Sequence, residues 1–243
     1  MLVDGGGSGY GRKDSVGPKV VGPLLRKRGI SRIDVVVLSH AHDDHVQGLV
    51  SVLRDFRVGM VLDTGNPHAS ESYERFLELV ERRKVPYKRA VRGQVIDLDG
   101  EVKVRVLSPP KGGVKGSDGL NDESIVLRVT YGRSAILLTG DAGHDAEAGI
   151  LASGEEVGAD VLKVGHHGSS TATSGAWLDA VRPKVAVISV GKNNRFGHPS
   201  SSVLRRLAAR KITVKRTDRD GAVVILSTKT DSTISTPSSR ASD

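Results

Sequence analysis

The sequence contains no cysteine and few aromatic residues, and each shortage excludes something. Without cysteine among its 243 residues, the chain can form neither disulfide bonds nor thiolate metal sites. Cysteine usage therefore does not indicate whether the chain lies in an oxidising or a reducing compartment. Aromatic residues make up only 3% of the chain, which leaves few rings for stacking single-stranded bases. No apolar run reaches the roughly 18 residues of a membrane span, and the N-terminal MLVDGGGSGYGRKD is too polar for a signal peptide. The chain as given is therefore expected to be soluble.

The charge of the chain is strongly positive. Lysine and arginine number 36 against 28 aspartates and glutamates, which gives a formal net charge of +8. This excess favours a polyanionic partner, either nucleic acid or an anionic lipid surface. A cationic surface that serves solubility alone explains the charge equally well.

The pattern of apolar residues predicts an α/β fold. Short β-branched runs alternate with amphipathic stretches, as expected of strands covered by helices. Strands are expected at 34–39, 58–63, 101–108, 124–130, 134–140, 159–165, 184–191, 212–217 and 222–228. Helices are expected at 16–29, 45–56, 70–84, 144–154, 174–182 and 199–211. The fourth and fifth strands are separated only by YGR, a turn that contains Gly132, so they should form an antiparallel hairpin.

One domain is expected for a chain of this length. Its elements suggest two halves, each a mixed sheet with helices outside, and the boundary between the halves should fall in the loop PPKGGVKGSDGL at 109–120. The domain is expected to span residues 1–227. The Ser/Thr-rich tail at 228–243 is expected to be disordered, because it has almost no large apolar side chain to bury.

The stretch SHAHDDH at residues 39–45 gathers three of the eight histidines of the chain. The apolar strand DVVVLS runs directly into it, which places it at the C-terminal end of a strand, where α/β folds carry their sites. Side chains two apart share a face of an extended backbone, so His40, His42 and Asp44 can converge on one region. His45 follows at once and turns towards a neighbouring point as a helix begins.

This density of donors predicts a metal site with more than one ion. Four donors within six residues exceed what one tetrahedral ion takes from a single loop when a catalytic position stays open. We therefore predict two adjacent divalent ions. Imidazole and carboxylate without thiolate suit zinc or manganese, and the sequence does not decide between them.

The stretch SHAHDDH resembles the HxHxDH signature of the metallo-β-lactamase superfamily, and other segments follow in the order that this superfamily has. The resemblance implies an αββα sandwich of two mixed sheets with outer helices. In LVDGG it implies that Asp4 braces the histidine loop from behind, and in LLTGD that Asp141 bridges two metals. In LKVGHHGS it implies a later histidine ligand, either His166 or His167.

A closer resemblance is to the β-lactamase-like C-terminal domain of the ComEC family of DNA-uptake proteins. The segments that carry it are, in order, SHAHDDHVQGL, NDESIVLRV, AILLTGD, ADVLKVGHHGSSTATS, RPKVAVISVGKNNRFGHPS, VKRTDRDG and AVVI. Domains of this family are similar to metal-dependent nucleases that degrade one strand of incoming DNA. The resemblance therefore implies a competence-associated DNase, and a parent protein at the cell membrane whose domain faces the DNA.

The chain departs from the family patterns in two places. Many superfamily members carry a lone metal-binding histidine between the HxHxDH loop and the LLTGD aspartate, but here the interval holds only His68, in GNPH. ComEC-like domains have asparagine instead, which matches Asn121 in NDES; it can be an oxygen ligand, a hydrogen-bond partner of substrate or water, or a turn residue. The chain also begins after the strand pair that opens a ComEC-like domain, so an N-terminally truncated domain without its first strands is expected.

The resemblance assigns a role to each matching residue. His40 and His42 would bind one metal, and Asp44 and His45 the second. Asp141 would bridge the two ions, and His166 would add a ligand. The other candidates are His167, His198 and Asn121, with Asp44, for catalysis; Lys192, Asn193, Asn194, Arg195 and Ser169 for substrate binding; and Asp4 as the brace.

Two of these assignments have alternatives. His167 would protonate a leaving oxygen or orient substrate, but it and His166 could exchange roles. The pair His198-Pro199 could instead be a plain entry to a helix, with proline in the first turn.

Three functions are consistent with these residues. The leading one is a phosphodiesterase that cuts single- or double-stranded DNA, with two ions about 3.5 to 4 Å apart promoting in-line attack by water. The scarcity of aromatic residues modestly weakens this prediction. The second is hydrolysis of a small phosphodiester or another ester by the same centre. The third is an inactive fragment that binds metal or DNA without turnover.

Overall fold

The computed structural model describes residues 1–7, 16–114 and 119–236, which form two compact units, Met1–Ala90 and Val91–Asp243. The boundary predicted at 109–120 is therefore wrong. The described residues of that loop belong to the second unit, where the backbone N–H of Val114 donates to the carboxylate of Glu123 over 2.6 Å. Its proline and glycine residues thus mark a connection within the second unit.

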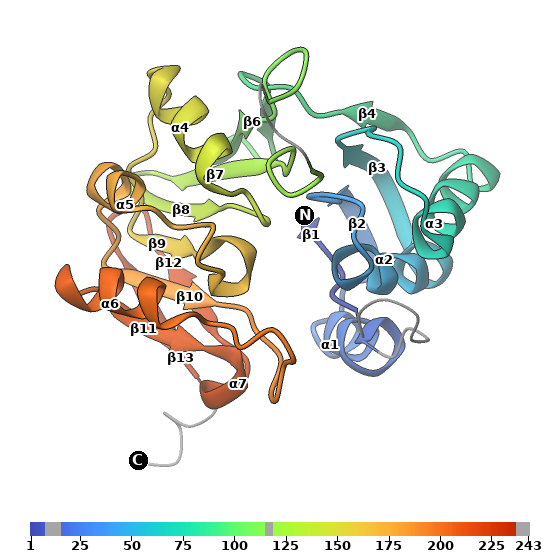
Figure 1. Ribbon diagram of the computed structural model, residues 1–243. Coiled ribbons are helices and arrows are strands. Elements are labelled where there is room, and N and C mark those ends of the chain that lie inside the picture. The colour runs from blue at the N-terminus through green and yellow to red at the C-terminus, as the bar shows by residue number, and fades with distance from the viewer. Residues whose placement is uncertain (8–15, 115–118, 237–243) are drawn as a thin grey trace. The chain divides into compact units, whose positions relative to one another are not determined.

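The first unit contains a four-stranded sheet in the order β1-β2-β3-β4 (Figure 1). Its strands are β1 (Leu2–Val3), β2 (Arg32–Val37), β3 (Arg57–Asp63) and β4 (Tyr87–Arg89). Every described pairing in this sheet is parallel, although a mixed sheet was predicted. Parallel neighbours need crossover connections, and here α2 and α3 supply two of them.

The helices of the first unit begin and end close to where the sequence predicts them. A π-helical turn at Gly17–Val21 leads into α1 (Gly22–Lys27), followed by α2 (Asp43–Asp55) and α3 (Glu71–Arg82). The hydroxyl of Ser70 caps α3 by accepting from the N–H of Tyr73 over 3.3 Å. The core of the unit joins strand and helix side chains, among them Val36, Val37, Val61, Val46, Leu49, Leu53 and Phe76.

The second unit contains a seven-stranded mixed sheet in the order β11-β10-β9-β8-β7-β6-β5. Its strands are β5 (Val95–Asp97), β6 (Val102–Ser108), β7 (Val126–Tyr131), β8 (Ser134–Leu138), β9 (Val161–Lys163), β10 (Val185–Ile188) and β11 (Thr213–Arg216). The strands from β8 to β11 run parallel, and those from β5 to β8 antiparallel. The predicted hairpin is confirmed as β7 and β8, with Gly132 at a φ of +59° in its turn.

Three helices cover one face of this larger sheet: α4 (His144–Ala152), α5 (Gly175–Val181) and α6 (Ser201–Ala209). Alternate residues of β8, Ala135 and Leu137, point into the core that these helices close. Trp177 of α5 is 1% exposed within that core. Trp177 is therefore a core residue and not a platform for bases.

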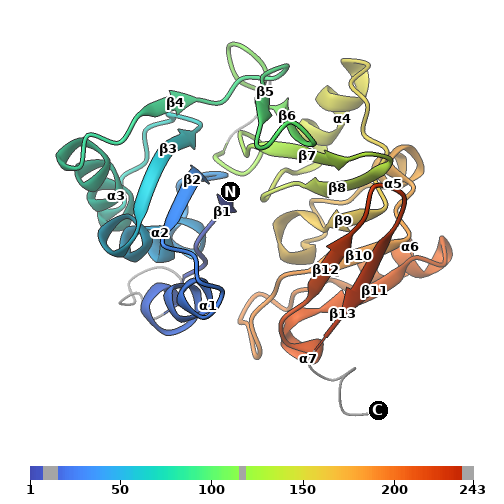
Figure 2. The same cartoon turned by 180° about the vertical axis from the view of Figure 1, so that it is seen from behind.

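The predicted disordered tail at 228–243 is wrong for part of its length. β12 (Val224–Ser227) pairs antiparallel with β13 (Ser232–Ser235) (Figure 2). The turn of this hairpin is held to the rest of the unit, because the N–H of Arg133 donates to the carbonyl of Lys229 and the hydroxyl of Ser134 to that of Thr228, each over 2.7 Å. Backbone pairing orders a segment whose side chains alone would not. Residues 237–243 lie outside the described residues.

The sequence missed only short elements. β1, β4, β5 and β13 have two to four residues each, and α7 (Thr217–Asp220) has four. Segments this short carry no readable periodicity. Among the described residues, no helix is long and apolar enough to cross a membrane.

Candidate metal centre

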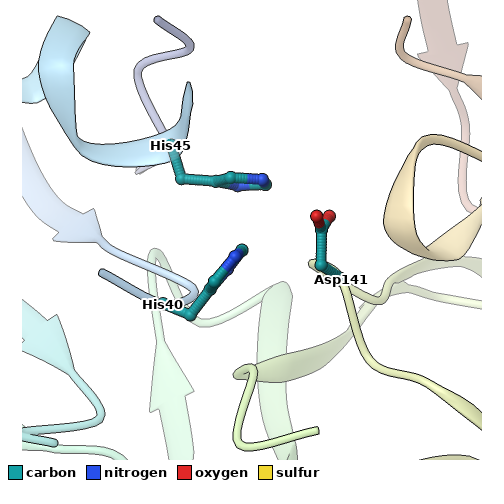
Figure 3. A group of neighbouring side chains, drawn as sticks. All are labelled: His40, His45 and Asp141. Carbon is teal, nitrogen blue, oxygen red and sulfur yellow. The ribbon is translucent and has the colours of Figure 1, made fainter. Parts of the chain in front are cut away.

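The histidine loop of the first unit joins the end of β2 to the start of α2. His40 follows the strand, His42 is the residue before the helix, and Asp44 and His45 lie in the first helical turn. The side chains of His40 and His45 are drawn in Figure 3. The sequence-based prediction that a strand end and a helix start carry these donors is therefore confirmed.

The imidazole rings of this loop lie close together. The Nε2 atom of His40 and the Nδ1 atom of His42 are 3.0 Å apart, and the ring centroids of His40 and His45 are 4.1 Å apart. His40 is fully buried, and His45 is 3% exposed. Two ring nitrogens at this separation could both bind one zinc ion, each at about 2.0 to 2.1 Å from it.

Asp4 braces this loop from the end of β1. Its Oδ2 atom lies 2.8 Å from Nδ1 of His45, and its two oxygens accept from the N–H and hydroxyl of Ser39 over 2.7 and 2.8 Å. Burial alone would raise the pKa of Asp4, but the contacts with His45 and Ser39 hold that pKa below its usual value. An ionised Asp4 places the proton of His45 on Nδ1 and so leaves Nε2 with a lone pair that could bind a metal.

Glycines let the LVDGG segment reach the start of α2. The N–H of Gly5 donates to the carbonyl of His45 over 2.8 Å, and the N–H of Gly48 donates to the carbonyl of Gly6 over 2.9 Å. A Cβ atom on Gly5 would lie 2.3 Å from the backbone nitrogen of Leu49, and one on Gly48 would lie 2.0 Å from the carbonyl oxygen of Gly5. Only glycine permits this approach, so both positions serve the placement of Asp4.

His68 lies beside the histidine loop. This proximity was not predicted from the sequence. Its ring is 5.5 Å from that of His42, at an interplanar angle of 76°. The segment GNPH that carries it follows β3, the parallel neighbour of β2. Because parallel strands end at the same edge of a sheet, this topology is the signal that could have identified His68.

The second unit positions Asp141 in a turn after β8. Asp141 is 2% exposed and is drawn in Figure 3. Its backbone N–H donates to the hydroxyl of Ser124 over 3.1 Å, while the ammonium of Lys163 donates to the carbonyl of Gly140 over 2.9 Å and lies 4.0 Å from Oδ1 of Asp141. The turn is thus held from two sides.

The NDES segment contributes further contacts to the same turn. The Oδ1 atom of Asp122 accepts from the N–H groups of Gly143 and Ala146 over 2.9 and 3.3 Å. These are backbone donors at the N-terminal end of α4, which an acceptor side chain stabilises. Ser124 therefore holds the backbone of Asp141 itself, and Asp122 holds the residues that follow it.

Both histidines of HHGS adopt left-handed backbone conformations, with φ of 45° at His166 and 53° at His167. Nε2 of His167 lies 3.3 Å from Oδ2 of Asp141, against 4.0 Å for Nε2 of His166. Nδ1 of His167 donates to the carbonyl of Ser189 over 2.7 Å, which fixes its tautomer and leaves Nε2 on the side of Asp141. Left-handed residues other than glycine are strained, and such strain concentrates at functional sites.

Asn121 lies beside His166. Its Nδ2 atom is 3.5 Å from Nε2 of His166, and its Oδ1 atom is buried and accepts no hydrogen bond from any described residue. A buried acceptor of this kind suits a metal ion or a bound water as its partner.

The segment 192–198 forms a loop whose side chains serve different purposes. The amide of Asn194 bonds both the N–H and the carbonyl of His198, over 2.9 and 2.7 Å, so it closes the loop and does not point to a substrate. The guanidinium of Arg195 lies over the ring of Phe196, 5.1 Å from its centroid. Lys192 and Asn193 are exposed.

His198 faces His166, with ring centroids 5.8 Å apart. Burial, and then the neighbouring His166 and His167, lower the pKa of His198, which keeps its imidazole neutral near pH 7. Helix α6 begins after Ser200, whose hydroxyl accepts from Val203. Ser169 is 7% exposed and its hydroxyl lies 3.0 Å from that of Thr171.

The donors of each unit fit divalent metal ions. The ligand atoms are imidazole nitrogens and carboxylate oxygens, which zinc and manganese both accept. In each unit a histidine ring is oriented from behind by an oxygen, from Asp4 in the first and from the Ser189 carbonyl in the second. Such oriented rings are typical of metal ligands.

The known proteins that this chain resembles are consistent with a metal site. The model of the family described as "Metallo-beta-lactamase superfamily" matches residues 1–192. Among curated proteins, "ComE operon protein 3" of Bacillus subtilis is 33% identical over 86% of this chain and 26% of its own length. "Competence protein ComA" of Neisseria gonorrhoeae is 36% identical over 83% of this chain and 26% of its own length. The chain spans about a quarter of these relatives.

Among solved structures, the metallo-β-lactamase fold protein YhfI of Bacillus subtilis has a TM-score of 0.54 with this chain. The match covers 88% of this chain and 94% of that protein, at 12% sequence identity. At this identity the likeness concerns the fold alone. The predicted fold class is confirmed.

Proposed function

Because the chain belongs to the metallo-β-lactamase superfamily, we propose that it is a metal-dependent phosphodiesterase that cleaves DNA. The observation that carries this proposal is the oriented donor set in each unit, above all the Asp4–His45 contact behind the histidine loop. In this proposal these donors bind a pair of divalent ions, zinc or manganese.

The proposed ligands follow the order expected from the sequence, with one exchange. His40 and His42 would hold one ion, Asp44 and His45 the other, and Asp141 would bridge them. The distances within the second unit support His167 as the further ligand, because its Nε2 atom lies nearer to Asp141 than that of His166 does.

With His167 as the further ligand, His166 and His198 would lie next to the phosphodiester and take the catalytic roles. Two bound divalent ions would supply an activated water and neutralise the charge that develops on the phosphoryl oxygens. His166, between Asn121 and His198, is then the candidate donor of a proton to the leaving oxygen. Asn121 would orient the attacking water through its buried Oδ1 atom.

The choice of DNA as substrate has two supports. The chain carries a net charge of +8, which favours a polyanion. One curated relative is named as a competence protein, and the family resemblance seen in the sequence is to DNA-uptake proteins. Within such proteins the domain would act on DNA that enters the cell at the membrane.

A small phosphodiester is the second candidate. Only 3% of the residues are aromatic, so base stacking would contribute little and contacts to the phosphate backbone would have to dominate. A centre that recognises mainly the phosphodiester would also accept a small one.

The test compares the protein with its Asp44→Ala, His45→Ala double variant. Linear single- and double-stranded DNA and bis(p-nitrophenyl) phosphate are incubated with each protein, in EDTA or with added Mn²⁺ or Zn²⁺. Metal-dependent cutting of DNA by the unchanged protein, lost in the variant, is the expected result.

Other outcomes separate the alternatives. Cutting that persists in the variant would reveal a contaminating nuclease. Hydrolysis of the small ester without cutting of DNA would favour the second candidate, and retention of DNA or metal without any turnover would favour an inactive binding fragment.

A further inference from the structure

A pocket lined by arginines lies at the end of the first unit's sheet where β2 and β3 begin. This pocket of about 280 Å³ is lined by Arg32, Arg57, Val58, Gly59, Arg83 and Val85. Arg32 begins β2 and Arg57 begins β3, and the two are register partners across the parallel pair. The histidine loop follows the other end of β2. The pocket is therefore separate from the residues that we assign as metal ligands.

The positive charges of the three arginines are not balanced by an equal number of carboxylates. Of the described residues that line the pocket, none is acidic. Within the described part of the chain, the carboxylate paired with a lining arginine is that of Asp34, whose Oδ1 lies 3.0 Å from Nε of Arg32, and both side chains are well exposed. Three like charges around one pocket repel each other, and a bound anion would offset that repulsion.

The walls of the pocket are held by backbone contacts. A guanidinium nitrogen of Arg83 donates to the carbonyl of Leu53, near the C-terminal end of α2, so one cationic wall is fixed in place. Gly59 lets β3 lie close to β2 beside the pocket, because a Cβ atom there would lie 2.6 Å from the carbonyl oxygen of Asp34. Val58 and Val85 supply an apolar floor.

We infer that this pocket binds a phosphodiester group of a nucleic acid strand, away from the bond that is cleaved. Planar guanidinium groups donate paired hydrogen bonds to the oxygens of phosphate, as they do to those of carboxylate, which suits a phosphodiester group. The inference rests on the proposed function for the identity of the strand. β3 covers seven residues from Arg57 to Asp63, so about 20 Å of strand separates the pocket from the edge that carries the histidine loop.

This separation predicts a dependence on the length of the nucleic acid. A strand of about 4 nucleotides, at roughly 3.4 Å per stacked nucleotide, cannot reach both places, whereas one of about 24 nucleotides can. The pocket should therefore strengthen the binding of long strands and leave that of short ones unchanged.

The experiment measures fluorescence anisotropy of labelled single strands of both lengths, in EDTA so that nothing is cut. Arg57→Gln should weaken binding of the long strand about tenfold, the loss expected for one charged hydrogen bond. Arg57→Lys, which keeps the charge, should recover part of the affinity. Lys27→Gln removes another exposed cation of the same unit and should cost less than about threefold.

Three results would overturn the inference. One is equal binding of the long strand by the unchanged protein and Arg57→Gln, and another is an equal loss in Arg57→Gln and Lys27→Gln. The third is an effect of Arg57→Gln only on binding of inorganic phosphate or of vesicles that contain phosphatidylglycerol, which would assign the pocket to another phosphate source.

The outcome is independent of the proposed catalysis. Hydrolysis of bis(p-nitrophenyl) phosphate tests the metal centre, and Arg57→Gln should leave its rate unchanged because that small ester does not reach the pocket. If the unchanged protein hydrolyses nothing, the proposed function fails, while the anisotropy still decides on the pocket.

Discussion

Oδ2 of Asp4 lies 2.8 Å from Nδ1 of His45, although 41 residues separate the two in the sequence. The contact joins the end of β1 to the first turn of α2 and holds the imidazole in one tautomer. Everything proposed for the histidine loop depends on this orientation, because a rotated ring would turn Nε2 away from an ion.

Asp4→Asn should therefore weaken metal binding while the fold persists. The amide has nearly the same size but no negative charge, and loss of such a contact behind a ligand costs about 10 to 100-fold in metal affinity. Calorimetric titration with Zn²⁺ or Mn²⁺ measures the change. Asp145→Asn, at an exposed position of α4, is the matched control and should bind as the unchanged protein does.

Gly48→Ala should destabilise the first unit by more than about 2 kcal/mol, because its Cβ atom would lie 2.0 Å from the carbonyl oxygen of Gly5. Gly149→Ala is the matched control within a helix. There the nearest atom to the new Cβ is a guanidinium nitrogen of Arg92 at 4.0 Å, so the change should be neutral or stabilise by up to about 1 kcal/mol. Urea denaturation of both variants decides, and an equal effect at the two sites would contradict the close-approach argument.

Asp122→Ala should lower both stability and metal affinity. The change removes the acceptor for the N–H groups of Gly143 and Ala146, which costs about 1 kcal/mol and loosens the turn that carries Asp141. Asn is nearly as good an acceptor at this position, so Asp122→Asn should restore most of both quantities. Thermal denaturation and metal titration are the measurements. Failure of the asparagine variant to recover would show that the charge, and not the cap, is what matters.

Asp63 should make stability fall as the pH rises. Burial raises the pKa of this carboxyl above its ordinary value of 3.8, even though the hydroxyls of Tyr73 and Tyr87 donate to it over 2.7 and 2.8 Å. The folded chain thus holds this proton more tightly than the unfolded chain does. The contribution to stability is complete below the ordinary pKa and is lost as the pH rises through the folded value.

The comparison of the unchanged protein with Asp63→Asn isolates this contribution. The difference between their free energies of unfolding, measured by urea denaturation in EDTA, should shift against the unchanged protein above about pH 4. Parallel pH profiles of the two proteins would contradict the assigned shift.

The sequence predicted much of the candidate site because local pattern determines it. His40, His42, Asp44 and His45 occur within six residues, and a strand followed by a helix leaves them little choice of position. The long helices and strands were also predictable, since each carries several turns or alternations of apolar residues. β13 was not, because only its pairing with β12 orders a segment of serine and threonine.

What the sequence determined by itself is the kind of chemistry: imidazole and carboxylate donors, without thiols, after apolar strands. The tertiary structure decided what depends on residues distant in the chain. It placed His68 beside His42 through the parallel pairing of β2 and β3, turned Nε2 of His167 towards Asp141 through the Ser189 carbonyl, and brought Arg32 and Arg57 together at one edge. The physical reason is that spacing along the chain fixes local conformation, whereas strand register and buried hydrogen bonds fix which distant side chains meet.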